Sequence, residues 1–414
     1  MQEQYPRWIV GRVREALADT PVVVVQGARQ TGKSTLTAEL AKESGATVVT
    51  LDDPEARLAA EADPESFIAG FGGGPVVLDE IQRAPQLILP IKAAVDRDRQ
   101  PGRFLLTGSA DLMRVPGAED SLAGRAETIR LRPLSQGEVG RRQDDFVARF
   151  LAEPDLSGWS SSWSRERYVD AICAGGYPTA LARNGERRRV WLADYVDRLM
   201  RGDLRDLTTA SPARLRKVLA LLAGAQTGEL VPARIARDVG VAEGTARGDV
   251  QRLSDLYLVD SVPGWSRSRT RRVVARAKAH VADSGLAAML SNLEADDLLS
   301  HLGVNHLGGL LEGFVSNELL RQSSWSSTRF DLSHYREAGG AEVDLLVELR
   351  GGKVLGLEVK ASSTARPDHA TGLMRLRDRL GDDFVAGVVL HLGERAWNMG
   401  ERLWALPVAA LWEL

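Results

Sequence analysis

The sequence predicts an α/β protein of several domains, with a parallel sheet covered by helices in its N-terminal third. Three observations favour this fold class. A chain of 414 residues is longer than one hydrophobic core normally serves, because cores stop growing at about 250–300 residues. The composition, 44% hydrophobic and 26% charged, is that of an ordinary globular protein. Apolar runs alternate with helical patterns from the start of the chain, which is the order of units in a parallel sheet.

We expect four domains, with boundaries where loop-like or basic segments interrupt the pattern. Residues 1–140 form the sheet domain, 141–210 a linker and helical lid, 211–280 a winged-helix-like domain, and 281–414 a smaller α/β domain. Cys173 is the single cysteine, which excludes an internal disulfide and fits a reducing, cytoplasmic location. No apolar run approaches the roughly 18 residues needed to cross a bilayer, so no membrane contact is expected.

The first element is an apolar strand that leads into a glycine-rich loop. Residues 21–26 (PVVVVQ) precede 27–34 (GARQTGKS), which matches the pattern GxxxxGK[ST], and leucines at helical spacing follow. In such a loop the backbone N–H groups surround phosphates, Lys33 reaches the β- and γ-phosphates, and Ser34 holds Mg²⁺. The residues expected to contact the nucleotide in this loop are Gly27, Ala28, Arg29, Gln30, Thr31, Gly32, Lys33, Ser34 and Thr35. The sequence therefore predicts an ATP and Mg²⁺ site.

Two further buried strands end in polar residues. Residues 75–80 (PVVLDE) end in Asp79, predicted to complete the Mg²⁺ shell, and Glu80, predicted to polarise the attacking water. The alternative is an ordinary helix N-cap pair. Residues 104–109 (FLLTGS) end in the hydroxyls of Thr107 and Ser109, which are placed to sense the γ-phosphate or the water.

Two more strands complete the predicted sheet, and an arginine lies between the last two. Adding residues 47–51 and 128–131 gives five candidate strands. Arg125 is a candidate arginine finger or sensor for the γ-phosphate, in the same chain or in a neighbouring copy. An arginine on a solvated face is the alternative.

The ordered set of motifs GARQTGKST, VVLDEIQ, LLTGS, SLAGR and LRPLSQGE resembles the AAA-type P-loop ATPase domain of a widespread bacterial and archaeal group. The resemblance extends over nearly the whole chain. It implies ATP hydrolysis at Lys33, Ser34, Asp79 and Glu80, and a C-terminal domain of restriction-endonuclease-like fold. Related ATPases frequently form rings, so a homo-oligomer is among the expected partners.

The middle region predicts a DNA contact. Residues 211–256 show three helical patterns with a tight turn before the third, and strand-like residues 257–262 and 273–277 flank a basic tip at 267–272. Residues 211–280 contain thirteen Lys or Arg against six Asp or Glu, a charge of about +7. This pattern favours a winged helix that binds DNA. A packing or lid module of the ATPase is the alternative.

The C-terminal region carries two carboxylates and a lysine in a spacing that resembles restriction-endonuclease-like nucleases. Asp344 is followed after thirteen residues by Glu358 and then Lys360. Such enzymes use two carboxylates to hold a divalent metal and a lysine to activate water. Glu312, on a preceding helix, is a further candidate metal ligand, with a solvated helix glutamate as the alternative. The predicted metal ligands of the chain are thus Ser34, Asp79, Glu312, Asp344 and Glu358.

We tested this spacing by the register of the predicted hairpin. A three-residue turn at 351–353 pairs Leu345 with Val359, puts the apolar residues on one face, and gathers the three polar residues on the other. An ordinary half-exposed hairpin shows the same alternation. The leading hypothesis is therefore an ATP-hydrolysing protein that processes DNA, with a Mg²⁺-dependent nuclease as its candidate second activity. The alternatives are an ATP switch whose C-terminal domain binds DNA or protein without cleavage, and a non-hydrolysing scaffold, which Glu80 argues against.

Overall fold

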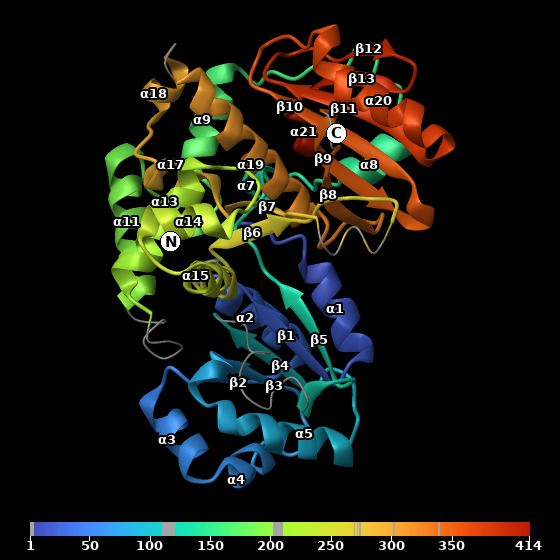
Figure 1. Cartoon of the computed structure of the whole chain (residues 1–414). Helices are drawn as coiled ribbons and strands as arrows, with labels where there is room; N and C mark the ends of the chain where they lie inside the picture. Colours follow the sequence, from blue (N-terminus) through green and yellow to red (C-terminus); the bar gives the residue numbers. More distant parts are fainter. Residues whose placement is uncertain are drawn as a thin grey trace. The chain divides into compact units, whose positions relative to one another are not determined.

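The computed structural model describes residues 4–109, 121–201, 210–268, 270, 272, 275–300, 303–337 and 340–414. The chain divides into two compact units (Figure 1). The N-terminal unit comprises Pro6–Pro133 and Asp255–Tyr257, and the C-terminal unit comprises Met1–Tyr5, Leu134–Ser254 and Leu258–Leu414. The regions predicted as linker, winged helix and C-terminal domain thus share one unit. Among the residues described, no helix is long and apolar enough to span a membrane.

The N-terminal unit is a five-stranded parallel sheet with strand order β2-β3-β4-β1-β5. Its elements are α1 Val10–Asp19, β1 Val22–Gln26, α2 Lys33–Ser44, β2 Thr47–Thr50, α3 Pro54–Ala62, α4 Pro64–Ala69, β3 Val76–Asp79, α5 Ile88–Arg97, β4 Phe104–Gly108 and β5 Ala126–Arg130. The predicted parallel sheet is confirmed by the pairing of its strands. Its central strands β1, β3 and β4 are short runs rich in β-branched and apolar residues, which favour extended structure.

Helices cover both faces of this sheet. Val22, Val24 and Phe104 point to one face, where they form a buried core with residues of α3, α4 and α5. In Figure 1, α1 and α2 lie on the other side of the strands. Because both faces are covered at the centre of the sheet, β1, β3 and β4 are buried strands that end in polar residues, whereas the edge strands β2 and β5 are largely exposed or half-buried.

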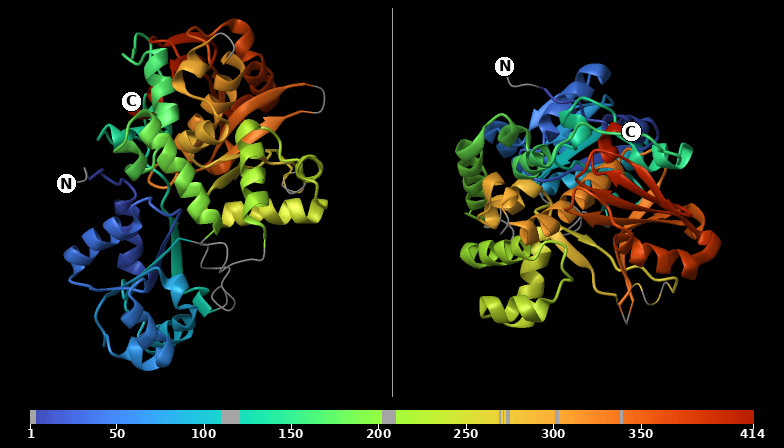
Figure 2. Two further views of the ribbon diagram at one scale, coloured as in Figure 1. Left: turned by 90° about the vertical axis from the view of Figure 1, so that its left-hand side faces the viewer. Right: turned by 90° about the horizontal axis from the view of Figure 1, so that it is seen from above.

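The C-terminal unit combines a helical layer with a mixed six-stranded sheet of order β12-β13-β11-β10-β9-β8. Its helices are α7 Gln136–Val139, α8 Phe146–Ala152, α9 Arg165–Ala174, α10 Pro178–Leu181, α11 Gly185–Arg201, α13 Pro212–Gly224, α14 Pro232–Val239, α15 Glu243–Asp255, α17 Ser284–Leu290, α18 Ala295–Leu299, α19 Val304–Gln322, α20 Thr371–Leu380 and α21 Ala410–Glu413. Its strands are β6 Val259–Val262, β7 Lys278–Val281, β8 Phe330–Arg336, β9 Glu342–Leu349, β10 Val354–Lys360, β11 Phe384–His391, β12 Trp397–Gly400 and β13 Leu403–Pro407. Helices α19 and α20 lie on opposite sides of the large sheet (Figure 2).

The three predicted helices of the middle region are present as α13, α14 and α15, and β6 and β7 form an antiparallel pair. The second strand begins at Lys278, later than the predicted range 273–277, of which residues 273 and 274 lie outside those described. Residues 269 and 271 of the predicted basic tip also lie outside them. The position of β7 is fixed by a second neighbour, because Ala279 N–H donates to the Gly228 carbonyl. The winged-helix assignment itself stays a prediction.

The predicted register of the β9–β10 hairpin is wrong by two residues. Leu345 pairs with Leu357 rather than with Val359, and the turn comprises Arg350–Gly352. Both turn glycines have a positive φ close to 80°, a conformation that residues with a side chain rarely adopt, so the turn closes earlier than predicted. A shift by two leaves the paired apolar residues on their predicted face, because strand side chains alternate.

A buried polar network joins the helical layer to α19. The guanidinium of Arg321, 2% exposed, pairs with the carboxylates of Glu318 and Asp283. Asp283 accepts hydrogen bonds from the N–H groups of Gly176 and Leu286. A side chain at Gly175 would place its Cβ 2.2 Å from Asp283 Oδ1, so glycine is required at this position, directly after α9. These contacts tie segments that are far apart in sequence into one unit.

Asp144, fully buried near this network, gives a prediction for pH dependence. Burial and the neighbouring Glu318 raise the pKa of Asp144 to about 8, with Glu138 and Ser135 also facing it. Its carboxyl group is therefore protonated in the folded protein between roughly pH 4 and 8 but ionised in the unfolded chain, so the free energy of unfolding falls as pH rises through this window. Asp144→Asn is expected to flatten that dependence, by up to about 5 kcal/mol over the window.

Denaturant titrations of wild type and Asp144→Asn at pH 5 and pH 8 measure this effect. Glu153→Gln, which removes an exposed carboxylate directly after α8, is the control and should show the pH dependence of wild type. Equal pH dependence in wild type and Asp144→Asn would show that Asp144 is ionised in the folded protein.

Candidate functional site

The glycine-rich loop connects β1 to α2, as the motif predicts. Residues 27–32 form the loop, and Lys33, Ser34 and Thr35 form the first turn of the helix. A Cβ at Gly27 would lie 2.1 Å from the Leu131 carbonyl oxygen, so only glycine fits there. Lys33 is 5% exposed, and its ammonium donates to the carbonyls of Gly27 and Ala28 at 2.9 and 3.1 Å. The loop therefore holds the lysine over the N-terminus of α2, where helix dipole and N–H groups favour an anion.

The carboxyl ends of β1, β3 and β4 bring the predicted metal ligands together. Ser34 Oγ donates to both oxygens of Asp79, at 3.2 and 3.0 Å. The hydroxyl of Thr107, at the end of β4, also donates to Asp79 and accepts the N–H of Glu80 at 3.0 Å. Thr107 thus lies in this cluster, at the strand end where its hydroxyl was predicted to act. A hydroxyl and a carboxylate in contact are the protein ligands that Mg²⁺ takes in P-loop sites.

Glu80 lies beside this pair in a constrained conformation. Its φ of 59° and ψ of 47° are left-handed, which is uncommon for a residue other than glycine and is often found at functional positions. Gln82 donates a hydrogen bond to the Glu80 carboxylate and another, at 3.0 Å, to Ser109 Oγ. Ser109 therefore belongs to the same cluster, as predicted, through a glutamine that the sequence did not point to.

Two side chains from distant segments support the loop. Arg7 donates to the carbonyls of Thr31 and Arg132, at 2.6 and 2.7 Å. The hydroxyl of Tyr257 donates to Gln26 Oε1 at 2.6 Å, immediately before Gly27. Neither residue carries a local sequence signal, because both act from outside the motif.

Arg125 does not reach this cluster. It precedes β5, whose first residue pairs with Val22 at the start of β1, so it lies at the opposite edge of the sheet from the loop. Its guanidinium forms two hydrogen bonds with Asp96, at 2.7 and 3.0 Å. Contact with a nucleotide bound by the same chain does not fit this position. A contact with the site of a neighbouring copy stays a prediction.

The C-terminal carboxylates and lysine also come together. Lys360 Nζ lies 2.8 Å from Glu358 Oε2 and 3.7 Å from Asp344 Oδ2. Asp344 Oδ2 accepts the N–H of Val359 at 2.9 Å, so this side chain continues the hydrogen bonding where strand pairing with Leu345 ends. The predicted trio is thus assembled, by a side-chain contact to the neighbouring strand. Lys360 also borders a cavity of about 500 Å³.

A second lysine, Lys278 on β7, lies within this cluster. Its ammonium is 2.8 Å from Glu312, 3.2 Å from Glu342 and 4.0 Å from Asp344. No motif or spacing in the sequence predicts that a residue of the middle region lies beside these carboxylates. Within the described part of the chain, no three His, Cys, Asp or Glu side chains are arranged to hold a metal ion.

Burial dominates the electrostatics of this cluster. Burial and the charge of Asp344 raise the pKa of Glu312 to about 7 and that of Glu358 to about 9. For Lys278, burial lowers the pKa, but Glu312 and Asp344 together more than compensate, so its pKa is raised. Lys278 therefore stays positively charged. The pKa values of Glu312 and Glu358 stay raised because the nearby lysines offset only part of the cost of burying these carboxylates.

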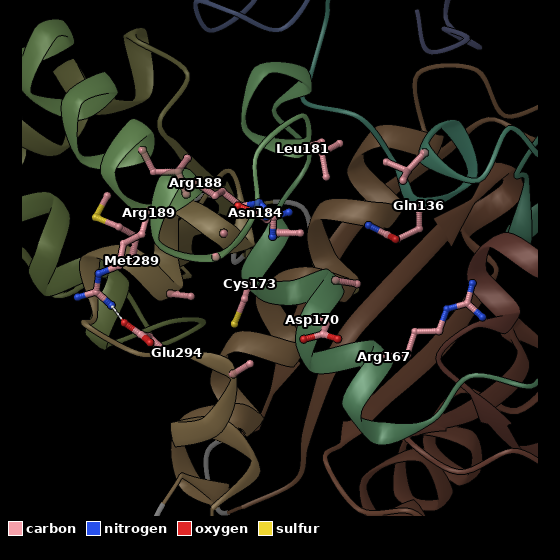
Figure 3. A pocket seen from close by; sticks show the side chains of 18 of the residues that line it. Gln136, Arg167, Asp170, Cys173, Leu181, Asn184, Arg188, Arg189, Met289 and Glu294 are labelled. Atoms are coloured by element: carbon pink, nitrogen blue, oxygen red, sulfur yellow. Dashed lines mark hydrogen bonds and ion pairs between the residues drawn. The ribbon is translucent and has the colours of Figure 1, made fainter. Parts of the chain in front are cut away.

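A cavity of about 890 Å³ lies elsewhere in the C-terminal unit (Figure 3). Asp170 and Cys173 of α9 line it, together with Leu181 and an ion pair between Arg189 and Glu294 at 2.9 Å. Burial raises the pKa of the Cys173 thiol to about 11, so it is not a nucleophile at neutral pH. The cavity contains none of the predicted site residues.

Three family models match the chain. An AAA domain model matches residues 19–140, and two models described as domains of unknown function (DUF8612 and DUF4143) match residues 165–297 and 307–411. The uncharacterized proteins Mb2031c of Mycobacterium bovis and Rv2008c of Mycobacterium tuberculosis are each 30% identical over 401 residues, which covers 96% of this chain and 82% of each relative.

Solved structures show a weaker likeness. The Walker-type ATPase PABY2304 of Pyrococcus abyssi is 16% identical with a TM-score of 0.43, over 68% of this chain and 94% of that one. AMPPCP-bound DnaA of Aquifex aeolicus is 14% identical with a TM-score of 0.28, over 59% and 86%. Likeness at these TM-scores carries no argument about function.

Proposed function

We propose, from the premise that this chain belongs to the same family as its two mycobacterial relatives and carries an AAA-type P-loop ATPase domain, that it hydrolyses ATP and uses the nucleotide cycle to control DNA binding by its C-terminal unit. The contact of Ser34 with Asp79, beside Glu80 and at the mouth of the loop that holds Lys33, is the observation that carries this proposal.

Each residue of the N-terminal cluster has a role in this proposal. Lys33 and the N-terminus of α2 would neutralise the phosphates of ATP, and Ser34 and Asp79 would hold Mg²⁺. Mg²⁺ supplies charge stabilisation for the phosphoryl group when bound. Glu80 orients and polarises the attacking water, while Gln82 and Ser109 keep its carboxylate in place.

DNA is the partner that the excess of positive charge in residues 211–280 favours. Much of this charge is balanced within the chain: Arg214 and Arg252 both pair with buried Asp249, and Arg272 pairs with Glu348. Lys217 and Arg247 are exposed on α13 and α15, and the pair that Arg247 forms with Glu243 is exposed as well, so these two are the better candidates for phosphate contacts. If these residues do not contact DNA, the alternative is an ATP switch that acts on a protein partner.

Steady-state ATP hydrolysis with and without single-stranded, duplex and branched DNA tests both parts of the proposal. We expect turnover that one form of DNA stimulates, loss of turnover in Lys33→Ala, and loss of stimulation alone in a Lys217→Glu/Arg247→Glu double variant. Glu186→Gln, at an exposed position near the start of α11, is the control. Turnover that is indifferent to every DNA would contradict the DNA partner while leaving ATP hydrolysis intact.

A second candidate function is Mg²⁺-dependent cleavage of DNA at Asp344, Glu358 and Lys360. The assembly of these three groups favours it, since two carboxylates for a metal and a lysine for the water are the parts that such chemistry requires. Glu312 would be a further metal ligand. Incubation of the same DNAs with Mg²⁺ or Mn²⁺ tests this function, and cleavage that survives in Asp344→Asn would exclude this site.

A further inference from the structure

Lys278 is held rigidly among the C-terminal carboxylates. It lies in β7 between two neighbouring segments, facing Val262 of β6 on one side and Glu229 on the other. On the latter side, the N–H groups of Leu230 and Ala279 donate to Ala277 and Gly228. Its side chain is 6% exposed, so its direction is set by packing rather than by solvent. The ammonium group is therefore placed by the backbone of β7.

The carboxylates around Lys278 are the groups that the nuclease hypothesis assigns to a metal. Glu312 and Asp344, with side chains 15% and 14% exposed, both lie within 4.0 Å of its nitrogen. Glu342, which is 41% exposed, is the third neighbour, at 3.2 Å. A buried ammonium requires paired and hydrogen-bonded carboxylates, and these supply them. The oxygens that would bind a metal are thus already engaged with a cation of the chain itself.

Lys360 engages further oxygens of the cluster. Its ammonium contacts Glu358 Oε2 and Asp344 Oδ2, and the same Asp344 oxygen accepts the Val359 N–H. A divalent metal ion bound at Asp344 would lie within a few ångströms of the Lys278 ammonium, and the two like charges would repel each other strongly at this buried position unless the lysine moved. In this conformation the residues therefore do not fit a bound metal ion.

We propose that Lys278 is the built-in cation of this cluster, which supplies the positive charge that a divalent metal would otherwise supply and keeps the metal out. The C-terminal domain then holds its partner without cutting while β7 stays in this position. Because Lys278 belongs to the β6–β7 pair and not to the large sheet, displacement of that pair would open the carboxylates to a metal. This inference rests on the second candidate function for the identity of the site, but not on ATP hydrolysis.

Binding of Mn²⁺ to the nucleotide-free, full-length protein tests the proposal. We expect calorimetry to show about one additional equivalent of Mn²⁺ bound by Lys278→Met compared with wild type, and loss of that equivalent in Lys278→Met/Asp344→Asn. Lys278→Arg, which keeps the charge, is the matched control and should resemble wild type. Mn²⁺ should also raise the Tm of Lys278→Met and leave that of wild type unchanged, because a ligand stabilises the state that binds it.

Two outcomes would overturn the proposal. One is Asp344-dependent binding of Mn²⁺ by wild type, and the other is a folded Lys278→Met that binds no additional metal. If Lys278→Met is unfolded, Lys278→Met/Glu342→Gln removes one of the uncompensated carboxylates and is measured in its place, and rescue of either variant by Mn²⁺ supports the proposal. Metal binding by Lys278→Met without DNA cleavage would leave the inference standing and contradict only the nuclease function.

Discussion

Glu80→Gln is expected to lower the kcat of ATP hydrolysis by about 10²–10⁴-fold while the affinity for ATP stays close to that of wild type. The glutamine keeps the shape of the side chain and its contact with Gln82, but it cannot polarise the attacking water. Phosphate contacts come from Lys33 and the loop, which the substitution leaves unchanged. Parallel measurements of turnover and of equilibrium binding of a fluorescent ATP analogue separate these effects.

Two comparisons make this result specific. Lys33→Ala is expected to lose binding as well as turnover, because it removes the charge that faces the phosphates. Glu39→Gln removes an exposed carboxylate of α2, outside the polar cluster, and should leave both measurements unchanged. Turnover in Glu80→Gln within a few fold of wild type would assign the water to another group, for which Asp79 is the neighbouring candidate.

Arg321→Met is expected to destabilise the C-terminal unit by about 3–5 kcal/mol, a decrease in Tm on the order of 10 °C. The substitution leaves Glu318 and Asp283 buried without a cation, and burial already raises the pKa of both carboxyl groups. Loss of the arginine raises these pKa values further. The folded variant then takes up protons that the unfolded chain releases, so its deficit should be larger at pH 8 than at pH 5.

Thermal and denaturant unfolding of wild type and Arg321→Met at these two pH values measure the effect. Arg189→Met is the matched control, because Arg189 pairs with Glu294 at the surface and such a pair contributes less than about 1 kcal/mol. A loss no greater than that of Arg189→Met would show that Arg321 does not compensate buried charge, and a loss independent of pH would show that its removal leaves the protonation of the two carboxyl groups unchanged.

The sequence was sufficient for the N-terminal unit because its signals are local. A buried parallel strand is a continuous apolar run, and the residues at its carboxyl end follow it directly, so Lys33, Asp79, Glu80 and Ser109 could be placed at one sheet edge. The alternation of side chains along the β9–β10 hairpin predicted that Asp344, Glu358 and Lys360 lie on one face. The predicted register differs from the observed one by two residues, and a shift of two keeps each side chain on the same face.

Residues that act across the fold could not be predicted in this way. Gln82 joins Glu80 to Ser109 of the neighbouring strand end, and Lys278 reaches the C-terminal carboxylates from the middle region. Arg125 shows the converse: its motif suggested the nucleotide, but the parallel register of β5 with β1 puts it at the far edge from the loop of its own chain. Each of these positions depends on pairing between segments, for which a local sequence pattern carries no signal.

The assignment of Asp255–Tyr257 to the N-terminal unit has a consequence for inheritance. The ATPase unit is not a contiguous stretch of the gene, since its last three residues are encoded at the end of α15 and in the turn between α15 and β6. One of them is Tyr257, whose hydroxyl holds Gln26 beside the phosphate loop. A single recombination at the end of the AAA segment would separate the loop from this tyrosine. The two units are therefore expected to be inherited together, and swapping one for a homologous module requires that the three-residue insert be replaced with it.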